Sequence, residues 1–282
     1  MLNIRATPTG RDRGRVRGAG PTTVESTPPS TSVRLPPGAI RVRSSHVRVG
    51  HTRLHYRVAG DGPPLVLLHG YGAASSWWRR NIGPLAEQRR VYAPDLGGFG
   101  RSWPKHRFSL ERTVECLDSW MQALGLPCAD LCGHSLGGHV CLRLAAAYPE
   151  RVRKLVLADA SGLPLQTSLL PLAWRSLRSQ GHTRFRFAPI ALATALQAGP
   201  LVLWSALHAL LADDVQTVLS GIAAPTLLVW GEHDLLVPLA LGQALHQAIQ
   251  GSRLVVVPGA GHNVIFECPE QFNRLVLDFL AE

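Results

Sequence analysis

Two hydrophobic patterns follow one another along the chain, and each predicts a different kind of strand. Between residues 46 and 58, apolar positions alternate with polar ones on either side of Gly50-His51. A period of two is typical of a strand with one buried face, and a glycine between two such runs favours a tight turn. We therefore expect a β-hairpin at the start of the folded domain. Its apolar side chains are Val47, Val49, Leu54, Tyr56 and Val58.

The second pattern consists of short, continuously apolar runs. They cover residues 65–68, 90–93, 129–132, 155–158, 226–230 and 254–257. Runs of this length are expected for strands that are buried on both faces of a sheet, and segments of helical length separate them. Their alternation predicts an α/β fold in which a mostly parallel sheet, joined by right-handed crossovers, is flanked by helices.

Residues 161–221 interrupt this alternation. The interval has no strand pattern and is rich in Leu, Ala, Trp and Arg. Its bulky side chains include Trp174, Phe185, Phe187 and Trp204. We predict a helical cap inserted between two parts of the core, residues 41–160 and 222–282, at the mouth of the sheet where α/β enzymes gather substrate contacts. In the alternative interpretation, the insert only packs against a neighbouring surface.

The first 40 residues differ in composition from everything that follows. They are rich in Arg, Pro, Thr, Ser and Gly and contain few large apolar side chains. Such a segment cannot bury enough surface to offset the entropy lost on ordering. We predict a disordered basic extension over residues 1–40. An organelle transit peptide would also be rich in Arg and poor in acid, but no amphipathic stripe is visible here.

The formal net charge of +10 raises the question of a nucleic-acid partner. Nearly all basic residues are Arg, with Lys only at Lys105 and Lys154, and they are scattered over the chain. Recognition of phosphate groups needs a clustered basic face. We therefore expect a small-molecule partner and no nucleic acid, while the oligomeric state stays open.

Neither a membrane span nor a metal site is expected. The apolar run around residues 190–211 is broken by polar residues, Gly199 and Pro200, whereas a spanning helix needs about 20 apolar residues. The five cysteines are odd in number, and none is spaced from another Cys or His like a metal ligand. We interpret them as buried thiols of a protein in the reducing cytoplasm. No ligand set for a metal, nucleotide or flavin cofactor is present.

The stretch Gly133-His134-Ser135-Leu136-Gly137 is the strongest indication of chemistry. It follows the apolar run that ends at Cys132 and precedes a helical pattern over residues 140–148. Between a buried strand and a helix, a G-x-S-x-G sequence forms a tight turn that holds the serine above the sheet edge. Its glycines avoid collisions with nearby backbone. Ser135 is the predicted nucleophile.

Together with four other motifs, this turn resembles the α/β-hydrolase superfamily. The matching stretches are residues 67–72 (LLHGYG), 94–102 (PDLGGFGRS), 133–137 (GHSLG), 230–234 (WGEHD) and 259–262 (GAGH). They occur in the family's order and span nearly all of the chain after residue 46. The resemblance implies an α/β-hydrolase fold with a helical cap. A serine at the turn argues against the dehalogenases and epoxide hydrolases of the superfamily, which use aspartate there.

A serine hydroxyl becomes an effective nucleophile only when a neighbouring base removes its proton. His262 lies in a Gly-rich loop after the last apolar run, at the same carboxyl edge as Ser135, and is the predicted base. The acid that orients it is predicted to be Asp234, which gives the chain order Ser, Asp, His. Asp159, at the end of an earlier run, stays open as an alternative acid.

Two further features concern the loop after residue 68, called here the oxyanion loop, and the residues that follow it. The resemblance implies that the backbone N–H groups of Tyr71 and Leu136 form the oxyanion hole. Trp77 and Trp78 follow that loop and either line the substrate pocket or pack against a helix face.

These residues predict a carboxylesterase-like serine hydrolase that cleaves an ester or related acyl bond of a small, apolar substrate through an acyl-enzyme intermediate. Two alternatives stay open. Residues 80–82 (RNI) and 271–275 (QFNRL) resemble the meta-cleavage-product hydrolases, which break carbon–carbon bonds, although Gly72-Ala73-Ala74 and Asn263 depart from that group. The second alternative is a non-catalytic ligand-binding protein that keeps the fold.

Overall fold

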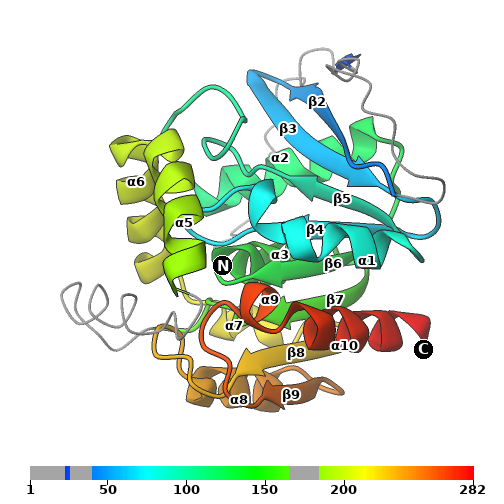
Figure 1. Cartoon of the computed structure of the whole chain (residues 1–282), viewed down its shortest axis with the longest axis vertical. Helices are drawn as coiled ribbons and strands as arrows, with labels where there is room; N and C mark the ends of the chain where they lie inside the picture. Colours follow the sequence, from blue (N-terminus) through cyan, green and yellow to red (C-terminus); the bar gives the residue numbers. More distant parts are fainter. Residues whose placement is uncertain (1–22, 26–39, 165–183) are drawn as a thin grey trace, which may run out of the picture.

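Within residues 23–25, 40–164 and 184–282, which this computed structural model describes, nine strands form one sheet (Figure 1). Their order is β1-β2-β3-β5-β4-β6-β7-β8-β9, and the pairs from β5 to β9 are all parallel. The strands are β1 (Thr23–Glu25), β2 (Arg43–Val49), β3 (Thr52–Ala59), β4 (Pro64–Leu68), β5 (Arg90–Pro94), β6 (Ala129–His134), β7 (Val152–Ala158), β8 (Thr226–Gly231) and β9 (Arg253–Val257). Every predicted apolar run is a strand, so the mostly parallel α/β sheet is confirmed.

The predicted hairpin is present as β2 and β3. The two strands pair antiparallel from Arg43 opposite Val58 to Val49 opposite Thr52. Gly50 turns the chain with a φ of 55°, which a glycine adopts without steric cost. β3 then pairs antiparallel with β5, which joins the hairpin to the parallel part of the sheet.

Helices cover both faces of the sheet, and alternate side chains of the central parallel strands enter different cores. In β4, Val66 and Leu68 pack in the core shared with α2 and α3, whereas Leu65 and Leu67 pack in the core shared with α1 and α10. The helices of the core are η1 (Ser75–Arg80), α1 (Ile82–Ala86), α2 (Leu110–Ala123), α3 (Leu136–Ala147), η2 (Pro149–Arg151), α8 (Leu239–Ala248), α9 (Val264–Glu267) and α10 (Pro269–Ala281). This two-faced burial explains why the parallel strands are apolar throughout.

The described part of the predicted cap is helical. It comprises α5 (Arg184–Ala198), α6 (Pro200–Ala212) and α7 (Gln216–Leu219), and α5 and α6 lie beside the carboxyl ends of the parallel strands (Figure 1). Trp174 and the side chains of Phe185 and Phe187 lie outside the described residues. No single described helix is long and apolar enough to cross a membrane; α5 and α6 meet that criterion only as a pair, which is bent by 100°.

A charged cluster fixes the end of the cap to the core. Asp213, directly after α6, contacts His139 Nε2 at 2.6 Å and accepts two hydrogen bonds from Arg143 at 2.6 and 2.8 Å. Both partners belong to α3, the helix that begins after Ser135. Hydrogen bonds of this charge-assisted type are the stronger ones, so the cap returns to the core at a defined position.

One part of the predicted disordered extension is ordered. Thr23–Glu25 forms β1, which pairs antiparallel with β2 opposite His46–Arg48. The prediction is therefore wrong for these three residues, and the remainder of 1–39 lies outside the described residues. The physical reason is that the outer edge of β2 offers free N–H and C=O groups, with which a short extended segment of almost any composition can pair.

Candidate active site

Ser135 lies on a sharp turn between β6 and α3. Its φ and ψ of 52° and −117° are not helical, and it precedes the first helical residue, Leu136. A Cβ on Gly137 would collide with the carbonyl oxygen of Leu68, and a Cβ on Gly133 would collide with that of Gly137. The glycines are therefore required because the turn packs directly against the end of β4, as the sequence pattern predicted.

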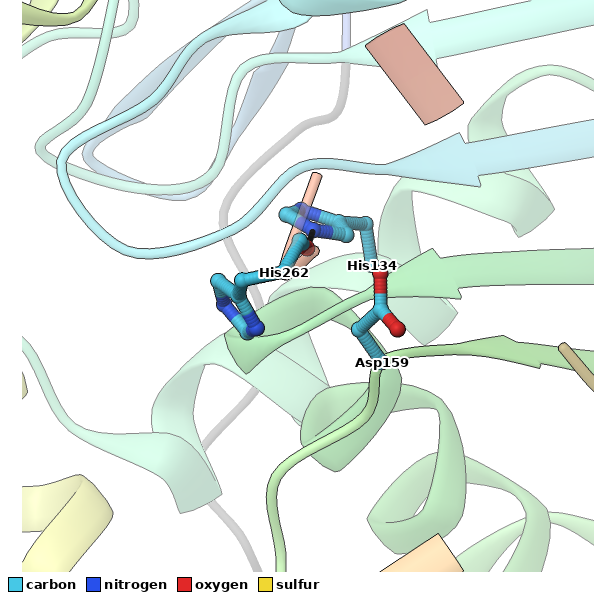
Figure 2. Close-up of side chains that lie close together, drawn as sticks. All are labelled: His134, Asp159 and His262. Atoms are coloured by element: carbon cyan, nitrogen blue, oxygen red, sulfur yellow. Dashed lines mark hydrogen bonds between the residues drawn. The ribbon is translucent and has the colours of Figure 1, made fainter. Parts of the chain in front are cut away.

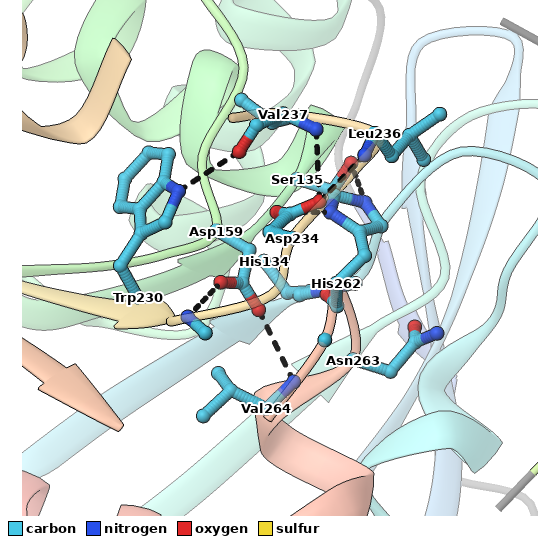
Figure 3. Close-up of polar contacts among 12 residues, drawn as sticks. His134, Ser135, Asp159, Trp230, Asp234, Leu236, Val237, His262, Asn263 and Val264 are labelled. Carbon is cyan, nitrogen blue, oxygen red and sulfur yellow. Dashed lines mark hydrogen bonds and ion pairs between the residues drawn. The ribbon is translucent and has the colours of Figure 1, made fainter. Parts of the chain in front are cut away.

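The imidazole of His262 lies between Ser135 and Asp234 (Figure 3). Its Nε2 is 3.0 Å from the Ser135 hydroxyl oxygen, and its Nδ1 is 2.8 Å from one carboxylate oxygen of Asp234. All three residues are at least 94 % buried, with exposures of 6 %, 6 % and 4 %. With a hydrogen on Nδ1, the ring donates to the carboxylate and leaves Nε2 to accept from the hydroxyl.

The second carboxylate oxygen of Asp234 is held by its own loop. It accepts hydrogen bonds from the N–H groups of Leu236 at 2.8 Å and Val237 at 2.9 Å. The carbonyl of Val237 in turn accepts from the indole of Trp230, the penultimate residue of β8 (Figure 3). These bonds fix the carboxylate in the orientation that meets the imidazole.

Asp159, the alternative acid, occupies a different place. Its two carboxylate oxygens accept hydrogen bonds from Gly231 N at 2.8 Å and Val264 N at 3.1 Å (Figure 3). These residues lie in the segments that carry Asp234 and His262. Complete burial, followed by the negative charge of Asp234, raises the pKa of Asp159 well above its ordinary value. Asp159 therefore joins the two loops, while Asp234 contacts the imidazole.

His134, the residue before the serine, supports the backbone of His262. Its Nε2 is 2.8 Å from the carbonyl oxygen of His262, and the two rings are 5.1 Å apart. Burial lowers the pKa of His134 to about 3, so the ring is neutral and donates from Nε2. This contact was not predicted from the sequence.

Figure 2 shows that His134, Asp159 and His262 converge, as ligands of a metal ion would. One ligand atom from each lies within 4.8 Å of the others. However, the Asp159 oxygens and His134 Nε2 already hold backbone groups, and His262 is engaged with Asp234 and Ser135. A Cβ on Gly70 would lie 2.9 Å from the other nitrogen of His134, so backbone closes that side. The donor set does not fit a metal ion while these hydrogen bonds are in place.

Glu267 is a second supporting residue that the sequence pattern did not single out. Its carboxylate accepts from Gly261 N at 2.8 Å and Asn263 N at 3.3 Å, the residues on either side of His262. Burial raises the pKa of this carboxyl group. An acidic residue at the end of a short helix, five positions after the candidate base, was the available sign of this role.

The loop after β4 brings Tyr71 next to the serine turn. A Cβ on the preceding Gly70 would lie 3.2 Å from Ser135 Cβ, so this backbone closely approaches the serine. Leu136 is the first residue of α3, where N–H groups have no partner within the helix. His69 accepts from Leu96 N at 3.0 Å and lies 2.9 Å from the Gly70 carbonyl oxygen through its other nitrogen. These contacts give His69 a structural role in the loop after β4.

Trp77 and Trp78 point into different surroundings. The Trp77 indole donates to the Thr194 hydroxyl of α5 at 3.1 Å and therefore joins the core to the cap. Trp78 is fully buried, and its ring centroid lies 6.2 Å from that of Phe272 in α10. The packing alternative thus describes Trp78, and Trp77 lies at the boundary between the cap and the loop that contains Tyr71.

Two residues that carried the resemblance to meta-cleavage-product hydrolases form a structural network. The amide of Asn81 donates to Ile265 O at 3.1 Å and to the Asn273 side chain at 2.8 Å. Arg80 donates to Phe266 O at 3.0 Å and stacks on the Phe266 ring at 4.5 Å. This network fastens α9, which follows His262, to the rest of the core.

The loop of residues 95–102 is organised by the buried carboxylate of Asp95. It accepts from Ser75 N at 2.6 Å and Arg101 N at 2.7 Å and lies 2.8 Å from His55 Nδ1. Burial alone would raise the pKa of Asp95, but the contact with His55 and the backbone donors hold it well below its ordinary value. The carboxylate of Asp95 therefore fixes the conformation of this loop by accepting hydrogen bonds from backbone N–H groups within it and at Ser75.

Comparison with known proteins agrees with this architecture. Residues 63–211 match the family model described as alpha/beta hydrolase fold, and residues 209–282 match a model described as TAP-like protein. The chain belongs to the α/β-hydrolase family. The resemblance drawn from its five motifs and the expected fold class are therefore confirmed.

Similar α/β-hydrolases include enzymes of two activities. The chain is 33 % identical over 261 residues to a 2-hydroxy-6-oxo-6-phenylhexa-2,4-dienoate hydrolase from Burkholderia cepacia, covering 81 % of this chain and 91 % of the relative. It is 29 % identical to a pimeloyl-[acyl-carrier protein] methyl ester esterase from Nitrosomonas europaea, covering 78 % and 96 %. A solved dienoate hydrolase from a Rhodococcus species has a TM-score of 0.76 at 27 % identity, covering 86 % and 100 %. The chain is thus similar both to dienoate hydrolases and to a methyl ester esterase.

Proposed function

We propose that this α/β-hydrolase is a serine hydrolase that cleaves an ester or related acyl bond through an acyl-enzyme intermediate. The observation that supports this proposal most strongly is the continuous contact from the Ser135 hydroxyl through His262 to Asp234, at 3.0 and 2.8 Å. A hydroxyl, a base and an oriented carboxylate in this arrangement are what nucleophilic acyl transfer requires.

In the first half of the proposed reaction, Ser135 becomes acylated. His262 Nε2 takes the hydroxyl proton while the serine oxygen attacks the carbonyl carbon, and the N–H groups of Tyr71 and Leu136 stabilise the resulting oxyanion. The C–O bond to the leaving alcohol then breaks, and the alkoxide receives the proton from His262. Asp234 stabilises the imidazolium that exists between these two proton transfers.

In the second half, water replaces the alcohol. His262 takes a proton from water as the water oxygen attacks the acyl carbon, and it returns that proton to Ser135 when the acyl bond breaks. The carboxylic acid is released, and the enzyme returns to its starting state. The sequence of steps is balanced without a metal or an organic cofactor.

An apolar substrate group is supported by the surroundings of the oxyanion loop. A Cβ on Gly72 would lie 3.7 Å from Leu203 Cδ2 and 3.8 Å from Ala195 Cβ, both on cap helices. The Tyr71 hydroxyl donates to Leu203 O at 3.1 Å, so α6 is held next to this loop. Apolar side chains beside the proposed oxyanion hole favour an alkyl or aryl group over a charged one.

Hydrolysis of a carbon–carbon bond is the second candidate, supported by the 33 % identity to the dienoate hydrolase. A dienoate carries a carboxylate, which requires a cationic or amide partner when it is buried. Arg80 and Asn81, the residues of the matching motif, already hold Phe266, Ile265 and Asn273. We therefore place ester cleavage first.

The proposal is tested by labelling and by substrate comparison. A fluorophosphonate probe is expected to label the protein, and Ser135→Ala is expected to abolish labelling and to lower turnover by several orders of magnitude. Ser220→Ala, which changes an exposed serine at the end of α7, is the matched control and should leave both unchanged. Absence of labelling would favour a non-catalytic binding protein.

Parallel assays of the purified protein identify the bond that is cleaved. We expect turnover of p-nitrophenyl esters of graded acyl length and slower turnover of a 2-hydroxy-6-oxo-dienoate. Faster turnover of the dienoate, together with labelling of Ser135, would place carbon–carbon cleavage first and would leave the nucleophile assignment intact.

A further inference from the structure

The outer surface of the cap is unusually apolar. Of the nine large hydrophobic side chains that are exposed among the described residues, five belong to α5 and α6. They are Leu192, Leu196, Leu201, Trp204 and Leu211, with exposures of 62, 73, 47, 64 and 36 %. Single exposed apolar side chains are ordinary, but a group of this size on two consecutive helices indicates an interaction surface.

The spacing of these residues places them on the outward faces of their helices. Leu192 and Leu196 are four residues apart on α5, and Leu201, Trp204 and Leu211 follow one stripe of α6. Within α6, Val202 and Ala206 are the buried residues, although nearly every position of this helix is apolar. A helix that is apolar on all sides is normally enclosed by protein or lipid, so its outward stripe lacks an expected partner.

The same interval is free of acidic residues. Between Asp159 and Asp213 the chain contains four arginines and neither Asp nor Glu. Arg107, which is exposed, lines a groove together with Trp204 and His208. Glu111 and Asp213 line the groove as well, and Asp213 forms an ion pair with Arg143 of α3. By sequence, residues 160–212 therefore combine an apolar composition with a net positive charge.

We propose that the outer face of α5 and α6 docks on a lipid bilayer surface that carries anionic headgroups. Leu side chains enter the acyl boundary, the indole of Trp204 lies at the headgroup level, and Arg107, which shares a groove with Trp204, contacts lipid phosphate. This combination of residues is typical of helices that lie in the plane of a membrane interface. The inference concerns binding alone and holds whether or not Ser135 is catalytic.

The geometry favours docking over insertion across the bilayer. α5 and α6 are bent by 100° at Gly199, and their inner faces are fixed to the core by the Tyr71 and Trp77 hydrogen bonds. A straight span would have to break these contacts. Lying on the surface retains them and buries only the outward stripes.

A second copy of the chain is a less suitable partner. A twofold contact places the same surface of both molecules face to face. Two caps that contain arginines and no acid over this interval would bring like charges together, whereas anionic headgroups neutralise them. Charge complementarity therefore selects the lipid surface.

Vesicle flotation with the full chain tests this inference. We expect binding to vesicles of phosphatidylcholine with phosphatidylglycerol, weaker binding to phosphatidylcholine alone, and weakening by salt. The double variant Leu196→Asp/Trp204→Asp should bind at least about tenfold more weakly, because two apolar anchors are replaced by charges that anionic lipid repels. Val42→Asp is the matched control, since Val42 is 43 % exposed and precedes β2 near the amino-terminal ends of the parallel strands, whereas the cap lies beside their carboxyl ends.

A second measurement locates the contact and separates the outcomes. Brominated lipids should quench part of the tryptophan fluorescence, and Trp204→Phe should remove that quenching although six other tryptophans remain. Equal vesicle binding by the double variant and the control would overturn the proposal. Absence of vesicle binding would overturn it as well. If the protein were then a dimer that Leu196→Asp dissociates, the surface would be assigned to a second copy of the chain.

Discussion

Ser135 and Asp159 have positive φ angles of 52° and 45° at the ends of the adjacent strands β6 and β7. Such conformations cost about 1–3 kcal/mol at a residue other than glycine, so neighbouring contacts must maintain them. The N–H of Ser135 donates to Ala158 O, and that of Asp159 donates to Val229 O, both at 3.0 Å. Each strained residue is therefore held by the next strand of the sheet, which supports the proposal that this edge is functional.

Substitution of the two aspartates should separate their roles. Asp234→Asn is expected to reduce turnover by about 10³–10⁴-fold and to leave folding nearly unchanged, because the amide no longer stabilises the imidazolium. Asp159→Asn is expected to lower stability by about 1–3 kcal/mol, because its NH₂ group would face a backbone N–H. Turnover should fall less in this variant than in Asp234→Asn, because Asp159 affects turnover only by holding the two loops in place.

Both variants are measured by ester hydrolysis and by urea unfolding. The assignment would be reversed if Asp159→Asn abolished turnover at unchanged stability while Asp234→Asn stayed active. Equal effects on stability in the two variants would also contradict a purely bridging role for Asp159.

At the scale of elements, the packing of α3 against β4 sets the position of the nucleophile. The first turn of α3 approaches β4 so closely that a Cβ on Gly137 would collide with Leu68 O and lie 2.8 Å from His69 O. Gly83 in α1 has no atom within 4 Å of the corresponding Cβ position. The two glycines therefore differ in the space around them, although both lie in helices.

This difference predicts opposite effects of alanine. Gly137→Ala should destabilise the protein by about 3 kcal/mol or more, because backbone of α3 or β4 would have to move. Gly83→Ala should be neutral or stabilise the helix by about 0.5–1 kcal/mol. Urea unfolding measures both, and similar stability of the two variants would contradict close packing at the serine turn.

At the scale of the whole molecule, burial of titratable groups on several elements links folding to pH. His69, His134 and His139 are all buried, and burial lowers the pKa of each. A histidine whose pKa is lower in the folded than in the unfolded state contributes stability that is complete above the unfolded value of about 6.5. This contribution is lost as the pH falls, and for His134 the loss continues down to about pH 3.

Comparison with His134→Gln isolates one of these groups. The free energy of unfolding of the wild type should fall by about 2–3 kcal/mol more than that of the variant between pH 7 and pH 4.5. Asp159, whose pKa is raised, acts in the opposite direction, since its contribution is lost as the pH rises above its unfolded value. The Asp159 contribution is present in both proteins and therefore cancels when their free energies of unfolding are subtracted. Identical pH profiles of the two proteins would contradict a buried neutral His134.

The sequence predicted the elements well because their causes are local. The six apolar runs and the hairpin are strands, since burial on one or two faces imposes a pattern that is readable within a few residues. β1 was missed because a three-residue strand at an edge needs only a free partner, which no local pattern reports. Trp77 and Trp78 were indistinguishable for a related reason: neighbours in the chain, they face α5 and α10 respectively.

By itself, the sequence determined the strand order along the chain, the serine turn and the prediction of Ser135 and His262 as nucleophile and base, because each follows a buried strand whose carboxyl end reaches a common edge. Only the tertiary structure decided which of two aspartates meets the imidazole, and that His134 and Glu267 support the backbone around it. These contacts join groups whose distance depends on how the helices pack on the sheet. Periodicity specifies which face of an element is buried, whereas the partner of a buried polar group is fixed only when the elements have come together.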